Sequence, residues 1–277
     1  MRDNSRPAGN AERRTSVRKN FGFGSRSLTT DGPLTACVLV IGNEILSGKT
    51  QDTNLQFLGN ELSKLGIQLE EARVVQDEET AIVTAINECR AKYSYVFTTG
   101  GIGPTHDDIT ASCVAKAFDR KLKLDPEALK RMQRGTGNLN EARRKMATVP
   151  EDSILIDNPV SNAPGFQVEN VFVLAGVPSI ARAMFASAMK SLRKGQRIYS
   201  QGVDIFLREG DIAEPLTRIA LDNPDVEVGS YPFSREGRYG ANLVVRSRDP
   251  KRIEKTLASI VDTMTALGAE FTIGPLV

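Results

Sequence analysis

The sequence has only one histidine and no closely spaced cysteines, and these shortages exclude several kinds of site. A single imidazole, that of His106, cannot build a multi-histidine metal site. It also argues against a Ser-His-Asp triad, because no serine is evidently placed as the nucleophile. The three cysteines, Cys37, Cys89 and Cys113, form no CxxC pair. This favours buried free thiols in a reducing compartment over a disulfide or a metal site.

Long apolar runs and a large net charge are also lacking. No stretch approaches the roughly 18 apolar residues that a membrane-spanning helix needs, so we expect no membrane partner. The formal net charge of +2 does not suggest a nucleic-acid-binding protein. With 277 residues, of which 40% are hydrophobic and 25% charged, the chain is typical of a soluble globular protein with one large or two ordinary domains.

Residues 1–32 differ from the rest of the chain. They contain six arginines and one lysine against three acids and show no apolar periodicity. This composition predicts a disordered basic tail. Its arginines and serines also suit a transit peptide, although the acids Asp3 and Glu12 do not. We therefore expect a cytoplasmic protein, with the mitochondrion as the alternative if the tail is a transit peptide.

Residues 33–193 alternate between strand and helix patterns. "ACVLVIG" is a continuous apolar run, as expected of a strand that is buried on both faces. Leucines then recur at helical spacing up to Gly66. "IQLEEARVV", "YSYVFTTG" and "VFVLAG" predict further strands, with a helix expected from Asp107 to Phe118 and a basic helical stretch over 119–150. This order predicts an α/β domain with a parallel sheet and helices on both faces.

Residues 194–277 show a different order. A strand, a helix, a hairpin around "SREGRYG", a long helix and a last strand "AEFTI" follow one another. This is the split βαβ, ferredoxin-like pattern of a small α+β domain. We expect Tyr231 and Phe233 to pack or to shape the hairpin instead of stacking bases, and we expect no nucleic-acid partner.

Three of the predicted strands end in unusual residues: "IGNEILSGKTQDTN", "VVQDEE" and "TTGGIGPTHDD". The carboxyl ends of parallel strands lie along one rim of the sheet, where ligands bind in doubly wound folds. We therefore expect these three segments to converge. Gly100, Gly101 and Gly103 suit a phosphate-binding turn at a helix N-terminus, or simply a tight strand-to-helix turn.

Adjacent carboxylates, Asp107 and Asp108, follow this turn. We expect one of them to cap the following helix. Beside a phosphate-binding turn they also suit Mg²⁺, which takes one or two carboxylates together with phosphate oxygens. Asp52 and Asp77 could add ligands or hold water, and Glu44 could accept hydrogen bonds from a base or a sugar. Each of these three is equally well read as a surface acid.

The segment "NPVSNAPGF", from Asn158 to Phe166, is polar and bracketed by prolines. Its composition predicts a loop, and a second binding loop near the same rim is compatible with it.

Four segments together resemble the MoaB/Mog (molybdopterin-binding) domain: "VIGNEILSGKTQDTN", "GGIGPTHDDIT", "NPVSNAPGF" and "GVPSIARAMF". More narrowly, they resemble the CinA-like branch, which includes the amino-terminal domain of competence/damage-inducible protein CinA and the related domain of eukaryotic FAD synthases. The likeness covers about residues 36–190, and 195–273 is similar to the small domain that follows in CinA-like proteins. This sequence has "VSNAPG" and "AGVP" where the family commonly has "GTAPG" and "PGVP", which leaves the precise substrate open.

The resemblance implies a three-layer, mostly parallel α/β domain that binds a pterin or a nucleotide at its glycine-rich rim. It implies either metal-dependent hydrolysis of a dinucleotide pyrophosphate such as ADP-ribose or FAD, or adenylylation of molybdopterin with ATP. A non-catalytic pterin- or nucleotide-binding module is the third reading. The implied cofactor is Mg²⁺ or another divalent metal, molybdopterin is an alternative ligand, and the implied assembly is a homo-oligomer, either a dimer or a trimer.

The resemblance also implies roles for individual residues. Asp77, Asp107 and Asp108 would be catalytic, with Asp108 and Asp77 on the metal. No catalytic role is expected for His106, which occupies a variable position of the motif. The residues expected to bind substrate or phosphate are Gly42, Asn43, Glu44, Asp52, Asn54, Gly100, Gly101, Gly103, Pro104, Thr105, Thr110, Asn158, Pro164 and Gly165.

Overall fold

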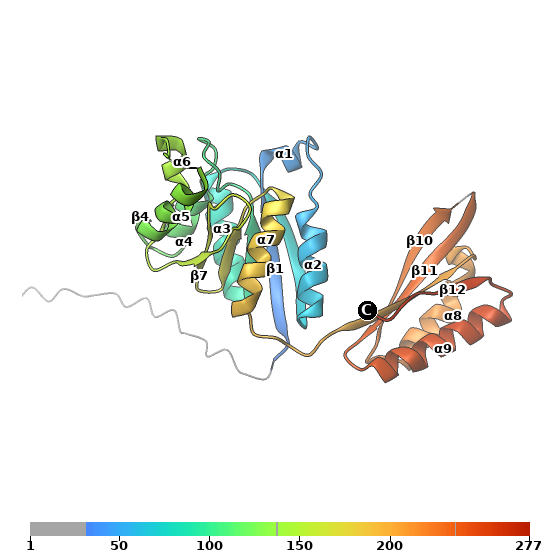
Figure 1. The fold of residues 1–277 in the computed structure, drawn as a ribbon. Helices are drawn as coiled ribbons and strands as arrows, with labels where there is room; N and C mark the ends of the chain where they lie inside the picture. The colour runs from blue at the N-terminus through green and yellow to red at the C-terminus, as the bar shows by residue number, and fades with distance from the viewer. Residues whose placement is uncertain (1–31, 137, 236) are drawn as a thin grey trace, which may run out of the picture. The chain divides into compact units, whose positions relative to one another are not determined.

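The computed structural model describes residues 32–136, 138–235 and 237–277 (Figure 1). The predicted basic tail, apart from Gly32, lies outside the described residues. None of the described helices is long and apolar enough to cross a membrane. The predicted domain boundary at 193/194 stays a prediction.

The first of two large sheets has six strands in the order β2-β1-β3-β8-β7-β6. Their bounds are β1 Leu34–Ile41, β2 Ile67–Val75, β3 Tyr95–Thr99, β6 Ile154–Ile156, β7 Gly165–Val168 and β8 Val171–Leu174. The first four strands in this order are parallel, whereas β7 runs antiparallel to both β8 and β6. The predicted mostly parallel sheet is confirmed.

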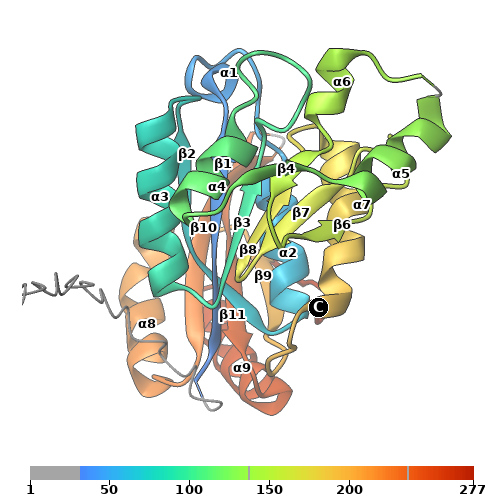
Figure 2. The same ribbon diagram turned by 90° about the vertical axis from the view of Figure 1, so that its left-hand side faces the viewer.

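Helices cover both faces of this sheet (Figure 2). Their bounds are α2 Asn54–Lys64, α3 Glu79–Lys92, α4 Thr110–Ala117 and α7 Pro178–Ala188. On one face, side chains around Leu39 and Ile86 form a core with α3 and α4. On the other face, a core around Leu62, Phe97 and Phe185 forms with α2 and α7. Because successive side chains of a strand point to opposite faces, a strand covered on both sides must be apolar at every position, as β1 nearly is.

The segment 119–150 is not the continuous helical stretch that its composition suggested. Strand β4, Leu122–Leu124, pairs antiparallel with β5, Thr148–Pro150. Between them lie α5, Pro126–Thr136, and α6, Glu141–Lys145. The prediction is wrong for two strands because "LKL" and "TVP" are too short to show a periodicity of their own. Two further short helical pieces are α1, Asn43–Leu46, and a 3₁₀ turn, Met189–Ser191.

The second large sheet has four strands in the order β10-β11-β9-β12, and all neighbours are antiparallel. The element bounds are β9 Tyr199–Ile205, α8 Glu209–Asp222, β10 Glu227–Arg235, β11 Arg238–Ser247, α9 Pro250–Ala266 and β12 Phe271–Ile273. This is the predicted split βαβ arrangement. Its core joins the sheet to both helices around Val203, Ile212 and Ile260. Phe233 packs edge-to-face on Phe206 with ring centroids 5.6 Å apart, which agrees with its expected packing role.

Candidate functional site

The three segments that follow β1, β2 and β3 meet at one rim of the first sheet. The backbone N–H of Gly42 donates to the Val75 carbonyl at 3.2 Å, and that of Asn43 donates to Asp77 Oδ2 at 2.8 Å. On the other side, the Gly100 N–H donates to the carbonyl of Leu174, the last residue of β8, at 3.2 Å. These contacts confirm the predicted convergence and tie the rim together through the backbone.

The glycine turn, residues 100–103, follows β3. Gly100 has φ +103° and Gly101 has φ +66°, which is backbone that other residues rarely adopt. A Cβ at Gly100 would lie 2.1 Å from the Ile41 carbonyl oxygen, and one at Gly101 would lie 2.2 Å from Thr110 Oγ1. These two glycines are therefore required by the close approach of β1 and α4, whatever else the turn does.

The same turn contains three backbone N–H groups without hydrogen-bond partners among the described residues. Across the part of the chain that the structure describes, the N–H groups of Gly101, Ile102 and Gly103 donate no hydrogen bond. Helix α4 begins shortly afterwards, anchored by a hydrogen bond of 2.9 Å from the Thr110 N–H to the Gly101 carbonyl. Consecutive free N–H groups beside a helix N-terminus favour a bound anion.

Neither aspartate caps helix α4. The helix begins at Thr110 with Ile109 as its N-cap, and no side chain caps it. The predicted cap and the predicted start at Asp107 are wrong, because Thr105 offers nearer donors. Its N–H donates to Asp108 Oδ2 at 2.8 Å, and its hydroxyl contacts both Asp107 and Asp108.

The two carboxylates share a single hydroxyl proton. A threonine hydroxyl donates only one hydrogen bond, so the Thr105 hydroxyl satisfies one aspartate at a time. This hydroxyl lowers the pKa of Asp107 below its ordinary value, so the carboxyl is ionised at neutral pH. Gly103 leaves room for the arrangement, since a Cβ there would lie 2.6 Å from Asp108 Oδ2.

The donor set fits a divalent metal that arrives with a phosphate. Mg²⁺ accepts one or two carboxylates and completes its shell with water and phosphate oxygens. Asp107 and Asp108 supply oxygen donors of this kind, but the described residues contain no group of three or more His, Cys, Asp or Glu that could hold a metal ion. Asp77 is engaged by the N–H of Asn43. The residues therefore suit a metal ion whose coordination shell is completed by the phosphate of the bound ligand. They do not form a complete metal site by themselves.

A pocket opens beside the glycine turn. Its polar part includes Asp108 and Lys145, and its apolar wall includes Leu122, Met146 and Phe166. Lys145 Nζ donates to the Thr105 carbonyl at 2.6 Å, so this cation stands next to the residue that both aspartates contact. Sequence reasoning missed Lys145, because in "NEARRK" it is one of three neighbouring cations and nothing local distinguishes it.

Several of the predicted binding residues have structural contacts at the rim. Asp52 Oδ1 accepts from the Leu55 N–H at 2.8 Å and so satisfies a donor at the start of α2. Asn54 is 3% exposed and donates from Nδ2 to the Gly176 carbonyl at 2.8 Å, while its Oδ1 is buried without a partner among the described residues. Thr110 Oγ1 donates to the Gly100 carbonyl at 3.0 Å. Their binding roles stay predictions.

The predicted second loop is also organised internally. Asn158 is buried, donates to Ser161 Oγ and the Ala163 carbonyl, and accepts from two backbone N–H groups. Pro164 lines the pocket beside the glycine turn. Gly165 is not in the loop: it is the first residue of β7, where a Cβ would lie 2.4 Å from the Val173 carbonyl oxygen. Of the predicted binding residues in this segment, the structure brings Pro164 to the pocket.

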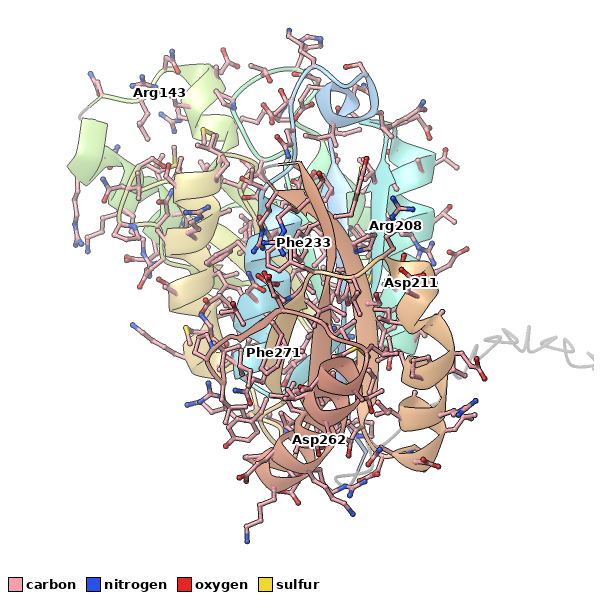
Figure 3. All side chains as sticks on the ribbon, turned by 90° about the vertical axis from the view of Figure 1, so that its right-hand side faces the viewer. Arg143, Arg208, Asp211, Phe233, Asp262 and Phe271 are labelled. Carbon is pink, nitrogen blue, oxygen red and sulfur yellow. The ribbon has the colours of Figure 1, made fainter. Side chains whose placement is uncertain are left out.

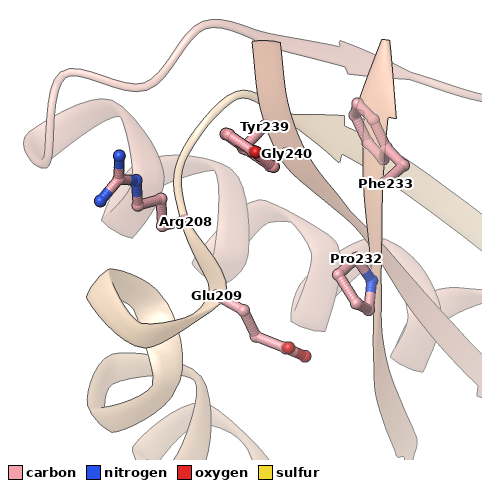
Figure 4. A pocket seen from close by; sticks show the side chains of 6 residues that line it. All are labelled: Arg208, Glu209, Pro232, Phe233, Tyr239 and Gly240. Atoms are coloured by element: carbon pink, nitrogen blue, oxygen red, sulfur yellow. The ribbon is translucent and has the colours of Figure 1, made fainter. Parts of the chain in front are cut away.

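A second hollow lies in the part of the chain that follows residue 193. It is lined by Arg208, Glu209, Pro232, Phe233, Tyr239 and Gly240 (Figure 4). None of the residues that the sequence predicts to bind or react lines it. The glycine turn with its pocket is therefore the candidate site.

Two protein families match parts of the chain. Residues 37–194 match the family described as "Probable molybdopterin binding domain". The chain belongs to this molybdopterin-binding domain family. Residues 197–269 match a second family, described as "FAD synthase, middle domain". The glycine turn, both aspartates and Lys145 all lie within the first match.

Individual relatives support the CinA-like resemblance. A protein of Archaeoglobus fulgidus is 36% identical over 221 residues, which cover 79% of this chain and 93% of the relative. A CinA-like protein of Kosmotoga olearia is 33% identical, covering 80% of this chain and 57% of the relative. A "Probable FAD synthase" of Caenorhabditis elegans is 31% identical, covering 82% and 49% respectively. The chain therefore spans about half the length of these last two relatives.

A solved structure supports the fold. The crystal structure of the protein CinA with unknown function from Thermoplasma acidophilum is 36% identical and superposes with a TM-score of 0.53. The match covers 56% of this chain and 96% of that chain. The predicted resemblance to MoaB/Mog-type, CinA-like proteins is confirmed.

Proposed function

We propose that the protein is a metal-dependent pyrophosphatase that hydrolyses a dinucleotide pyrophosphate such as ADP-ribose or FAD at the glycine turn. One observation carries this proposal: three backbone N–H groups without partners in the described chain stand directly before two carboxylates that share one hydroxyl proton. The N–H groups suit a phosphate, and the carboxylates suit the divalent cation that accompanies it.

Different residues of the site would bind the phosphate and the metal ion. The N–H groups of residues 101–103 and the start of α4 bind the phosphate and stabilise negative charge that develops on its oxygens. Asp108 and Asp107 would hold Mg²⁺ or a similar ion, which supplies charge neutralisation to the phosphoanhydride when bound. Because Asp107 is ionised at neutral pH, it acts as a ligand or a base and not as a general acid.

The relatives support an enzymatic role. The chain is similar to part of a protein named as an FAD synthase and to part of a CinA-like protein. Both relatives are longer than this chain, and the first bears the name of an enzyme. FAD contains the phosphoanhydride bond on which the glycine turn would act.

Two other functions are favoured by particular observations. Adenylyl transfer to molybdopterin is favoured by the match of residues 37–194 to a molybdopterin-binding family. Binding without catalysis needs only the free N–H groups of the glycine turn and gives the carboxylates no role in a reaction. We also infer a dimer or trimer from the resemblance, and light scattering after size-exclusion chromatography tests it.

A turnover screen separates the three functions. ADP-ribose, FAD, and ATP with a molybdopterin source are each incubated with Mg²⁺, Mn²⁺ or Co²⁺, and the products are identified. AMP release from ADP-ribose or FAD supports the proposal. Adenylylation that needs the pterin supports the second function. Tight binding with no product under any metal contradicts catalysis.

A further inference from the structure

Lys145 reaches the glycine turn from a distant part of the sequence. It is the last residue of α6, and its Nζ donates to the carbonyl of Thr105, 40 residues away. It lines the same pocket as Gly103 and Asp108. Among the described residues, its ammonium makes this one hydrogen bond and no ion pair with a carboxylate within 4 Å, although its charge contributes to the lowered pKa of Asp107. Two of its three N–H donors are therefore free for a ligand.

We propose that Lys145 is a second phosphate contact of the candidate site and that it binds the phosphate next to the one held by the glycine turn. The inference rests on the proposed function for the location of the site. Lysine binds phosphate as a flexible point charge, which suits a position at the mouth of a pocket. The site then takes a diphosphate in preference to a monophosphate.

The rest of the pocket indicates what the phosphates are attached to. Leu122, Met146 and Phe166 form an apolar wall, and Ser112 and Thr148 add hydroxyl groups to it. The pocket holds only about 70 Å³, so it takes the atoms next to the phosphates and not a whole ring system. The ligand class is therefore a diphosphate ester, with its charged part at Lys145 and its first apolar atoms toward Met146.

A purely structural role for Lys145 predicts something different. Its hydrogen bond to Thr105 lies at the surface, and a neutral donor of similar length would contribute about as much to folding. A structural lysine would therefore change stability when replaced, but it would not discriminate between pyrophosphate and phosphate.

Calorimetric titration of the full chain with inorganic pyrophosphate and with inorganic phosphate tests the proposal, with and without Mg²⁺. Lys145→Met should weaken pyrophosphate binding by about 10- to 100-fold and phosphate binding by much less, and Lys145→Arg should retain part of the affinity. Arg143→Met is the matched control, because it removes the same charge from the same short helix (Figure 3) without altering a residue that lines the pocket. It should change neither affinity by more than about 3-fold.

Equal losses in Lys145→Met and Arg143→Met would overturn the proposal, because they would indicate general charge attraction. Unchanged pyrophosphate binding in Lys145→Met would overturn it directly. If Lys145→Met does not fold, acylation of the wild-type lysines followed by mass spectrometry replaces it. Pyrophosphate should then slow acylation of Lys145 at least about 5-fold while leaving Lys64 unaffected, and equal rates with and without pyrophosphate would contradict the proposal.

The experiments distinguish a failure of the Lys145 proposal from a failure of the proposed pyrophosphatase function. Binding of pyrophosphate that depends on Lys145, without hydrolysis of any dinucleotide, supports the phosphate contact and contradicts the pyrophosphatase. Hydrolysis of ADP-ribose with the same KM in wild type and Lys145→Met supports the pyrophosphatase and overturns the phosphate contact.

Discussion

Replacing Gly100 by alanine should destabilise the protein strongly, because two costs add at this position. A non-glycine residue at φ +103° carries backbone strain of about 1–3 kcal/mol. The new Cβ would also lie 2.1 Å from the Ile41 carbonyl oxygen, so the ends of β1 and β3 must move apart. Forcing extra atoms into a packed region costs about 1–3 kcal/mol more. We expect the free energy of unfolding to fall by about 2–6 kcal/mol.

Gly48→Ala is the matched control for this prediction. Gly48 has φ +71°, and a Cβ added there would meet no atom within 4 Å, so only the strain of about 1–2 kcal/mol applies. Urea unfolding followed by far-ultraviolet circular dichroism measures both variants beside the wild type. The excess loss in Gly100→Ala over Gly48→Ala reports the clash with Ile41 together with the additional strain at the larger φ. Equal destabilisation by the two alanines would refute the conclusion that the rim requires glycine at position 100 for close backbone packing.

Three further variants test other contacts. Gly103→Ala should change the free energy of unfolding by no more than about 1 kcal/mol, because Gly103 does not have a positive φ. The new Cβ must displace the Asp108 carboxylate, so turnover should fall at least about 10-fold. Unchanged turnover would contradict the placement of Asp108. Glu71 has a pKa of about 2 instead of 4.5 because it accepts hydrogen bonds from Tyr93 and Arg73. The stability that the ionised Glu71 contributes is thus complete above pH 4.5 and is lost as the pH falls toward 2. In Glu71→Gln the free energy of unfolding should therefore fall less steeply between pH 4.5 and 2 than in the wild type. An unchanged pH dependence in this range would argue against these hydrogen bonds. Asn158→Ala should cost about 1–3 kcal/mol in urea unfolding, because the buried amide organises residues 158–163, and an unchanged midpoint would count against that role.

The sequence predicts the parallel part of the first sheet well, because its central strands are buried on both faces. Such strands have no polar alternation, so "ACVLVIG" is recognisable by composition alone. Once the strands are parallel, their carboxyl ends must share a rim, and the meeting of Gly42, Asp77 and Gly100 follows. The sequence does not predict the hairpin of β6 and β7, because β6 has only three residues and β7 begins inside the proline-bracketed segment whose composition predicts a loop.

The details of the site depend on contacts that the sequence does not contain. Asp107 and Asp108 have the composition of a helix cap, but Thr105, two and three residues before them, competes for their carboxylates, and α4 begins later. Lys145 belongs to the site through a contact across 40 residues that only the packing of α6 creates. Local propensity therefore identified the glycine turn, whereas the contacts of Thr105 and the packing of α6 decided how the charges around it are arranged.

The most direct test of the proposed chemistry is the initial rate of AMP release from ADP-ribose with Mg²⁺, measured for the wild type, Asp108→Asn and Asp262→Asn. Asp262 lies on α9 (Figure 3) and serves as the control for loss of one carboxylate outside the site. We predict that Asp108→Asn lowers kcat at least about 100-fold at an unchanged melting temperature, while Asp262→Asn behaves as the wild type. An Asp108→Asn variant that releases AMP at the wild-type rate would contradict a catalytic site at the glycine turn.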